Sequence, residues 1–425
     1  MSSSRTFKNK QPMAQKKKDK LSFFFIVSFL ISSFIYSIYF TDSPSYLPEI
    51  RISYSGNINR ADYINCTFEL DDDPILAKIR YRGDTNVNRP KKGYRLELSE
   101  QKSLLGMRQD DDWSLFAMYL DHTRMRVKLS FDLWNRLQSE DSNAILPDSR
   151  YVSLFVNGKF QGLYLLIEKN DRKLYDLDRD LNGIYSSVIF QPLKHTYYDD
   201  YEEDKWDQDW PNQEEDKEIK NEILPELFSF ICDTSDEEFF NSTDNIYSKF
   251  YKENIIDFFL YNYFNLHRDF WSKNYFLIRN SEPSKFFLVP WDFDGSFGQF
   301  GWWKYDTDID DESEIRERSI LYDRLLGNDE FRQDCKSRWI ELREDILSKD
   351  NIFDMIDDIY EEIKDVLEIE MRMWKPKTVE EKPADRYPDK FIYSTKEFDL
   401  DEYIDYLYEW IEERLDYCDS YFAEF

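Results

Sequence analysis

Alternating hydrophobic and polar positions characterise much of the chain between residues 49 and 168. Side chains of a strand point to opposite faces in turn, so this period of two predicts β-structure. Asn157-Gly158 stands between two apolar runs, which is typical of a tight β-hairpin. Strands are therefore expected at residues 49–54, 65–70, 75–81, 94–98, 151–156 and 162–168.

Helical spacing first appears at residues 122–138, where Met125, Leu129 and Leu133 fall on one stripe and Asp121 is placed to cap the helix. Apolar residues recur at three- and four-residue spacing in 222–265, 320–347, 352–374 and 398–424. This order predicts an α+β fold with two lobes. The N-terminal lobe (about 50–172) is rich in strands, and the C-terminal lobe (about 173–424) is helical.

Two segments interrupt these patterns. Residues 375–395 contain three prolines and separate two helical segments. Residues 195–221 are polar and acidic, and we expect a surface insertion there, either a solvated loop or an acidic docking site.

The N-terminus has the pattern of a membrane anchor. Residues 1–20 carry seven basic side chains and one acid, and residues 21–40 carry no charge. Twenty helical residues span about 30 Å, the thickness of a bilayer core. The basic flank is expected to stay in the cytoplasm, which places residues 41–425 outside it after a linker at 41–49. A cleaved signal peptide is the alternative.

Charge and cysteine content narrow the classes of function. The 425 residues include 56 Lys and Arg against 86 Asp and Glu, a net charge of −30. Such an acidic chain would repel a phosphate backbone, so we expect no nucleic-acid partner. A basic protein substrate suits it better. The four cysteines are far apart, without the pairs typical of zinc sites, and imply no particular disulfide.

The candidate chemistry lies in residues 267–298. His267-Arg268-Asp269 is followed five residues later by Asn274, then by a predicted hairpin that leads into Asp292-Phe293-Asp294-Gly295. Protein kinases use this order of parts: an Asp near the attacking hydroxyl, then Asn and Asp as Mg²⁺ ligands. Each piece alone is more often structural, but the ordered set favours phosphoryl transfer. In this hypothesis Asp269 is the catalytic residue, and Asn274 binds the metal together with Asp292 or Asp294.

Two further side chains are candidates by position. Lys92 shares by parity the strand face that carries Tyr94, and it either points into a cleft or solvates the start of the strand. Glu168 ends an apolar strand, and it either faces a cleft or pairs with a nearby cation such as Lys169.

The ordered motifs resemble those of the spore coat protein H (CotH) kinase family, an atypical branch of the protein-kinase-like fold. The resemblance covers roughly residues 50–424. It is carried by Arg82-Gly83, Pro90-Lys91-Lys92-Gly93-Tyr94-Arg95-Leu96, Trp113 with Asp121 and Arg126, Leu154–Glu168, Asp269–Asn274 and Pro290–Gly298.

This resemblance implies a serine/threonine protein kinase that uses ATP with Mg²⁺ or Mn²⁺ and acts on surface or coat proteins. Asp269 would be the catalytic residue, and Asn274 and Asp292 the metal ligands, with Asp294 as the other candidate. Lys92 would approach the nucleotide phosphates, and Arg82 and Glu168 would also bind the nucleotide.

The chain also departs from ordinary protein kinases. It has no glycine-rich G-x-G-x-x-G loop, and the predicted helix at 122–138 offers no Glu to pair a nucleotide lysine, Asp132 being the nearest acid. Fungal relatives act as host-binding invasins, so a surface adhesion protein on the same fold is an alternative. Another nucleotide-dependent transferase is a further alternative.

Overall fold

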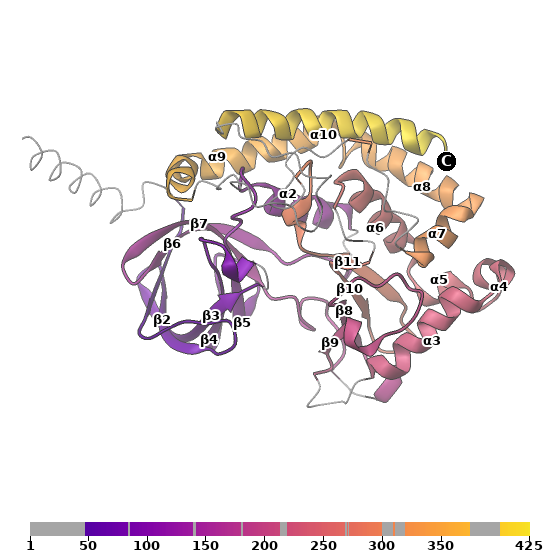
Figure 1. Ribbon diagram of the computed structural model, residues 1–425, viewed down its shortest axis with the longest axis horizontal. Coiled ribbons are helices and arrows are strands. Elements are labelled where there is room, and N and C mark those ends of the chain that lie inside the picture. The colour runs from indigo at the N-terminus through magenta and orange to yellow at the C-terminus, as the bar shows by residue number, and fades with distance from the viewer. Residues whose placement is uncertain are drawn as a thin grey trace, which may run out of the picture.

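The computed structural model describes residues 47–83, 86–138, 142–179, 182–212, 219–267, 270, 272–299, 309–310, 319–374 and 400–425. Within them the chain is a mixed α+β structure, rich in strands towards the N-terminus and in helices towards the C-terminus (Figure 1). This confirms the predicted class and the order of its two parts.

The N-terminal part is a closed barrel of seven strands. Its order is β1-β2-β3-β4-β5-β7-β6, and β1 closes it by pairing in parallel with β6. The strands are β1 (Glu49–Tyr54), β2 (Ile64–Leu70), β3 (Asp73–Arg82), β4 (Gly93–Ser103), β5 (Gln109–Phe116), β6 (Ser149–Val156) and β7 (Lys159–Glu168). The predicted hairpin at Asn157-Gly158 is confirmed as the β6–β7 turn.

Strand β7 is apolar on both faces because it belongs to two cores. Tyr164 and Leu166 point into the barrel, whereas Leu163, Leu165 and Ile167 join the core of the C-terminal part. A strand buried on both sides has a continuous apolar run in place of alternation. The run Leu163–Ile167 is therefore where the barrel is joined to the rest of the molecule.

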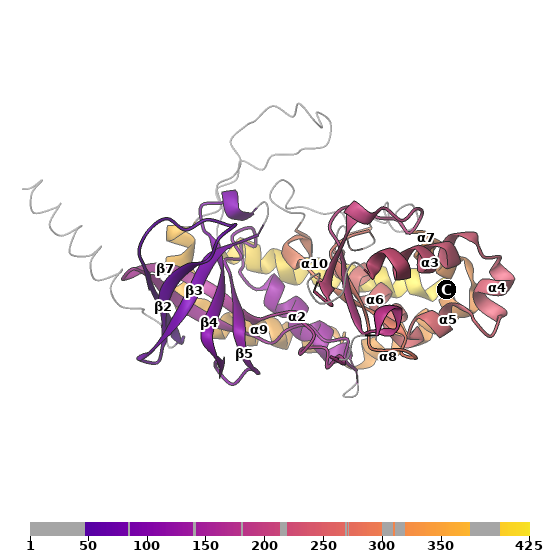
Figure 2. The same cartoon turned by 90° about the horizontal axis from the view of Figure 1, so that it is seen from below.

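The C-terminal part combines a four-stranded sheet with helices (Figures 1 and 2). The sheet has the order β11-β10-β8-β9, made of β8 (Val188–Pro192), β9 (Trp206–Trp210), β10 (Tyr275–Arg279) and β11 (Phe286–Pro290). The helices are α3 (Lys220–Asp233), α4 (Asp236–Asn241), α5 (Ile246–Lys249), α6 (Lys252–Phe264), α7 (Ile320–Gly327), α8 (Asp329–Glu344), α9 (Lys349–Met373) and α10 (Leu400–Ala423). Short 3-10 helices include η1 (Asn86–Asn88) and η4 (Phe293–Gly295).

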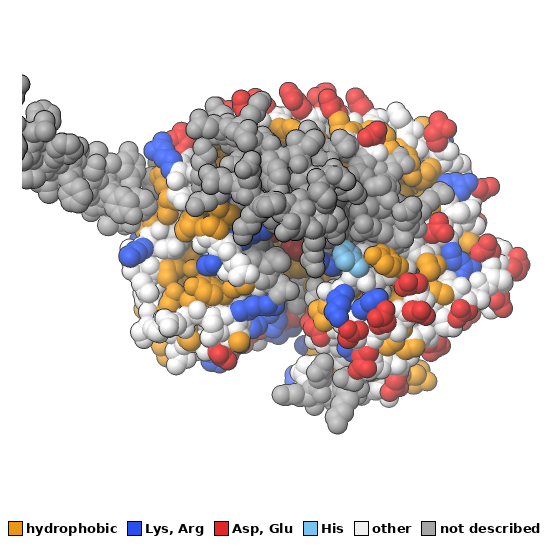
Figure 3. All heavy atoms as spheres, in the orientation of Figure 1, with side chains coloured by type: hydrophobic (Ala, Val, Ile, Leu, Met, Phe, Trp, Pro, Cys, Tyr) orange, Lys and Arg blue, Asp and Glu red, His pale blue; other side chains and the backbone are white. Residues whose placement is uncertain are grey.

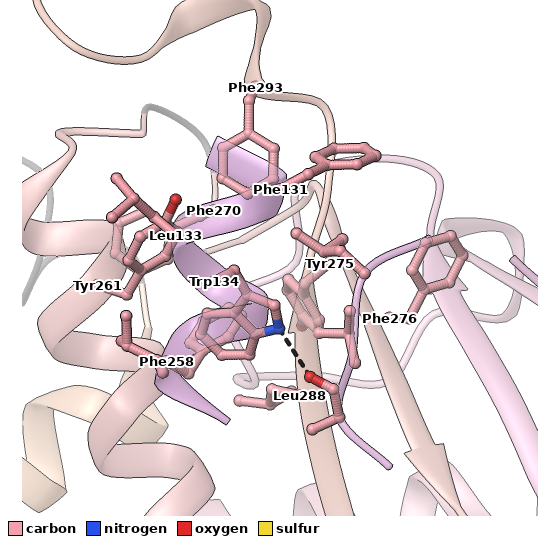
Figure 4. Packing of buried hydrophobic residues seen from close by; sticks show 14 of the residues in the cluster. Phe131, Leu133, Trp134, Phe258, Tyr261, Phe270, Tyr275, Phe276, Leu288 and Phe293 are labelled. Carbon is pink, nitrogen blue, oxygen red and sulfur yellow. Dashed lines mark hydrogen bonds between the residues drawn. The ribbon is translucent and has the colours of Figure 1, made fainter. Parts of the chain in front are cut away.

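Helix α2 (Arg126–Leu137) precedes β6 in sequence but packs in the C-terminal core. Its Trp134 lies among Phe258 and Tyr261 of α6 and donates a 2.7 Å hydrogen bond to the Ala144 carbonyl (Figure 4). The predicted capping acid, Asp121, accepts a 2.7 Å hydrogen bond from the Arg126 amide at the start of α2. The helix therefore connects the two parts.

A buried ionic network also joins the two parts. Glu370 of α9 accepts hydrogen bonds from Lys91 Nζ (2.7 Å), Arg124 Nε (2.9 Å) and the Leu163 amide (2.9 Å). All three charged side chains are fully buried. A Cβ at Gly162 would stand 2.1 Å from the Glu370 carboxylate, so only glycine fits there. Burial holds the pKa of Lys91 below its ordinary value.

The prediction of a surface insertion at 195–221 is wrong in part. The segment contains β9, and Tyr198 and Trp206 are buried in the core beside Phe228 of α3. The inward position between the two tryptophans of β9 is filled by Gln208, whose side chain bonds the Pro211 carbonyl and the Lys220 amide. A polar residue on the buried face therefore hid the alternation.

The expected anchor at residues 21–40 lies outside the described residues. No helix in the described part of the chain is both long and apolar enough to cross a bilayer. All four cysteines lie in the described part, and each is a free thiol.

Candidate active site

The β10–β11 hairpin brings the two predicted metal ligands together. Tyr275 pairs with Pro290, and the Trp291 amide donates a 2.8 Å hydrogen bond to the Asn274 carbonyl. Asn274 therefore lies across the hairpin from Trp291, next to Asp292. The backbone is left-handed at both ligands, with φ of +61° and +66°. Such conformations are uncommon outside glycine and cluster at functional sites.

Within residues 267–298, His267 connects the start of the segment to the turn at Asp292. Its Nε2 lies 2.8 Å from the Asp292 carbonyl oxygen, and its ring centroid is 4.8 Å from that of Phe293. Phe293 is buried against Phe131 of α2 and Tyr261 of α6 (Figure 4). The aromatic core thus fixes the turn that carries Asp292, while the Asp292 side chain itself is exposed.

The barrel supplies positive charge to the same place. Arg82, at the end of β3, lies over the Phe116 ring with its guanidinium carbon 3.4 Å from the centroid. Burial lowers the pKa of Arg82 to about 10, while the charges of Asp292 and Asp294 act in the opposite direction. Burial also lowers the pKa of Arg89, again against the attraction of Asp294. Arg82 therefore lies within the electrostatic reach of both acids, and Arg89 within that of Asp294.

Aromatic contacts hold the two sides together. Phe116 of β5 packs edge-on against Trp291, with centroids 5.9 Å apart, and Trp291 also contacts Phe131 and Phe276. In the space-filling view a notch separates the two parts, and Lys and Arg side chains gather along it (Figure 3). The contact of Phe116 with Trp291 thus brings the end of β5 against the turn that carries Asp292, so the candidate site draws residues from both parts.

Comparison with known proteins agrees with this geometry. The family described as CotH kinase protein matches residues 79–418. The chain belongs to this family. Inner spore coat protein H of Bacillus subtilis (strain 168) is 27% identical over 298 residues, which cover 63% of this chain and 74% of that protein. The family match begins within β3 and includes all the candidate site residues.

Not every predicted site residue is placed in the cleft of this CotH-family chain. Asp269 lies outside the described residues, and its catalytic role stays a prediction. Lys92 Nζ donates hydrogen bonds to the Val87 and Arg89 carbonyls (2.7 Å and 2.5 Å), so its ammonium supports the η1 loop. Its proposed contact with a nucleotide also stays a prediction.

Glu168 lies at the end of β7 and is 5% exposed. It accepts hydrogen bonds from the Arg108 and Asp148 amides, 2.7 Å and 3.1 Å long, and so ties the starts of β5 and β6 together. Burial raises its pKa despite these bonds. The alternative of an ion pair with Lys169 is wrong, since Lys169 pairs with Asp112 at 2.6 Å, and a role of Glu168 towards a nucleotide stays a prediction.

Two features escaped the sequence. Arg89 carried no motif of its own, although it enters the site from the η1 loop. The second feature is an ion pair between a lysine and a glutamate. Helix α2 has no Glu for such a pair, but Glu370 of α9 pairs with Lys91. A separation of 279 residues leaves no local signal, and a Lys-Lys pair does not say which member turns inward.

The residues suit a metal–nucleotide complex better than a free metal ion. In the described residues no group of three or more His, Cys, Asp or Glu side chains is gathered to hold a metal. Mg²⁺ in phosphoryl-transfer sites commonly needs only one or two carboxylates, with phosphate oxygens and water completing its shell. Asn274, Asp292 and Asp294 offer that set, and Arg82 with Arg89 offers charge for the phosphates.

Proposed function

We propose that this CotH-family chain is an atypical protein kinase that transfers the γ-phosphate of ATP to serine or threonine. The observation that carries the proposal is the hairpin bond from the Trp291 amide to the Asn274 carbonyl, which places Asn274 across from the residue that precedes Asp292, with the charge of Arg82 acting on the same acids. A Mg²⁺ or Mn²⁺ ion held by these residues would supply positive charge that stabilises the phosphates during transfer. The protein's part is to place oxygens and cations in advance.

Each residue has a defined part in this proposal. Asn274 and Asp292 hold the metal, and Asp294 adds a second carboxylate. Arg82 and Arg89 orient the phosphates by charge and directional hydrogen bonds. Asp269 accepts the proton of the acceptor hydroxyl, as the sequence motif implies. His267 keeps the Asp292 turn in place through the 2.8 Å contact with its carbonyl oxygen.

The proposed setting is the outer surface of a membrane. Residues 21–40 would anchor the chain, with the basic N-terminus in the cytoplasm and the barrel and helices outside. The relative in Bacillus subtilis is described as a spore coat protein. The proposed substrate is a basic, serine-rich surface or coat protein, since the chain is strongly acidic.

The test uses the full-length chain in mild detergent with γ-labelled ATP, Mn²⁺ or Mg²⁺, and a basic serine-rich peptide. We expect label in the peptide that requires metal and is lost in Asp269→Asn and Asp292→Asn. Glu368→Gln is the matched control because Glu368 is exposed on α9, where its carboxylate pairs with the equally exposed Arg372 at 3.0 Å.

Other outcomes would overturn the proposal. Label transferred from α-labelled ATP would indicate nucleotidyl transfer. An absence of both label and nucleotide binding, the latter measured by thermal shift, would favour the adhesion function. Full activity in Asp292→Asn with loss in Asp294→Asn would keep the reaction and reassign the metal ligand.

A further inference from the structure

The connection between β8 and β9 contacts the candidate active site at Ser272. The Thr196 amide donates a 2.9 Å hydrogen bond to the Ser272 carbonyl, and His195 Nδ1 lies 2.8 Å from Ser272 Oγ. Ser272 is fully buried. Both its backbone and its side chain are thus held by a segment more than 70 residues earlier in the chain.

The segment that holds Ser272 is itself fixed. Tyr198, three residues after His195, is 2% exposed and accepts a 3.1 Å hydrogen bond from the Tyr275 hydroxyl. The Tyr197 carbonyl accepts a 2.9 Å hydrogen bond from the Ile320 amide at the start of α7. His195 therefore extends from a part of the fold that is packed on several sides.

Asn274 depends on the placement of this backbone. It follows Ser272 by two residues, and its left-handed conformation (φ +61°) has to be maintained by its surroundings. On its C-terminal side the Asn274 carbonyl is held by the Trp291 amide. On its N-terminal side, Ser272 is held by Thr196 and His195.

We propose that His195 is a positioning residue that, through Ser272, fixes the backbone presenting Asn274 to the metal–nucleotide complex. This inference rests on the proposed function. A bond to a group that orients a metal ligand typically changes metal affinity even without contact with the metal. A purely structural histidine would instead change the stability of the fold and leave metal affinity as it was.

The experiment measures Mn²⁺ binding directly, from the spectrum of free Mn²⁺ in electron paramagnetic resonance. The full-length chain is titrated in the presence of a non-hydrolysable ATP analogue. We expect His195→Ala to weaken Mn²⁺ binding about tenfold. His195→Asn should restore it to within about twofold, because an amide retains both a donor and an acceptor near the Nδ1 position.

Two further variants sharpen the result. Lys194→Ala is the matched control, since Lys194 is exposed and pairs with the exposed Asp204. Ser272→Ala closes a double-mutant cycle with His195→Ala, and the double variant should bind no more weakly than either single variant. Thermal unfolding of every variant reports whether the fold is kept.

The outcomes separate this inference from the proposed function. Wild-type protein that binds no Mn²⁺–nucleotide would overturn the proposed function itself. Tight wild-type binding that His195→Ala leaves unchanged would overturn only the role of His195. Additive losses in the double variant, or a His195→Asn variant as weak as His195→Ala, would contradict action through Ser272.

Discussion

At the scale of single residues, Arg82 links the barrel to the acidic side of the cleft. Its guanidinium lies on Phe116 and faces Asp292 and Asp294. We expect Arg82→Ala to raise the KM for ATP about tenfold, since a charged hydrogen bond to a phosphate is lost. Arg82→Lys should recover only part of it, because lysine lacks the planar face that stacks on the ring.

The control for this prediction comes from the same strand. Lys78 of β3 is exposed and pairs with Glu97 on the neighbouring strand, at 2.6 Å. Lys78→Ala removes the same charge without touching the cleft, so its KM for ATP should match that of the wild type. Equal effects of Lys78→Ala and Arg82→Ala would mean that only the total charge matters.

Asp209 on β9 gives a prediction about pH. Its side chain is exposed at the surface but is surrounded by neighbouring protein atoms. Partial loss of hydration, and next the negative charge of Asp207, raise its pKa from 3.8 to about 6. The folded state therefore binds this proton more tightly than the unfolded state. The resulting stability is fully present below pH 3.8 and is lost as the pH rises through about 6.

We expect Asp209→Asn to raise the free energy of unfolding at pH 7.5 by about 1 kcal/mol, a small value because an exposed group is screened by water. At pH 4 the variant and the wild type should unfold alike. Denaturant titrations at both pH values measure the difference, with Asp200→Asn as an exposed control. A gain that is equal at both pH values would contradict the assigned pKa.

Sequence order predicted the hairpin of the candidate site, but it could not predict which residues from distant segments lie beside it. Asn274 and Asp292 follow from the spacing of polar residues around a hairpin, and the hairpin is confirmed. Strand parity favoured Lys92 as the inward lysine, but the buried one is Lys91, because its partner Glu370 comes from far along the chain. Local patterns carry the chemistry of short segments, whereas partners from distant segments leave no trace in them.

At the scale of elements, the strands and helices with clear periodicity were predicted and β9 was not. Strand β9 has acids at its outward positions, and Gln208 occupies the inward position between its two tryptophans. Its composition therefore resembles that of a loop. What makes it a strand is pairing with β8 and burial of Trp206 under Tyr198. Tertiary contacts of this kind override local composition.

Helix α9 carries the clearest stability prediction at this scale. Removing the Glu370 charge leaves Lys91 and Arg124 buried without their shared carboxylate, and breaking a buried ion pair in this way typically costs about 3–5 kcal/mol. We expect Glu370→Gln to lower the free energy of unfolding by about that amount in a denaturant titration.

The same helix provides the comparison. Glu368 pairs with Arg372 on the exposed face of α9, where an ion pair contributes little. Glu368→Gln should therefore stay within about 0.5 kcal/mol of the wild type. If Glu370→Gln were as mild as Glu368→Gln, the buried network would not be what joins α9 to the barrel.

At the scale of the whole molecule, charge is divided unevenly along the chain. Residues 1–20 carry seven basic side chains and one acid, a charge of +6, and residues 21–40 carry none. The remaining chain therefore has a net charge of −30 − (+6) = −36. On the face that Figure 3 shows, acidic side chains are most numerous along the upper edge and over the right-hand, helical part. A field of this sign draws cationic partners and repels anionic ones.

This field leads to the last prediction, on the choice of substrate. We expect a basic serine peptide to be phosphorylated with a kcat/KM at least about tenfold above that of a neutral peptide with the same serine, because long-range attraction speeds encounter. The advantage should fade as salt rises from 0.1 M to 1 M, since the screening length falls from about 10 Å to about 3 Å.

The neutral peptide is the control, as its rate should change little with salt. A preference for the basic peptide that survived 1 M salt would instead indicate recognition by direct contacts in the cleft, and an equal rate for both peptides at low salt would contradict electrostatic selection altogether.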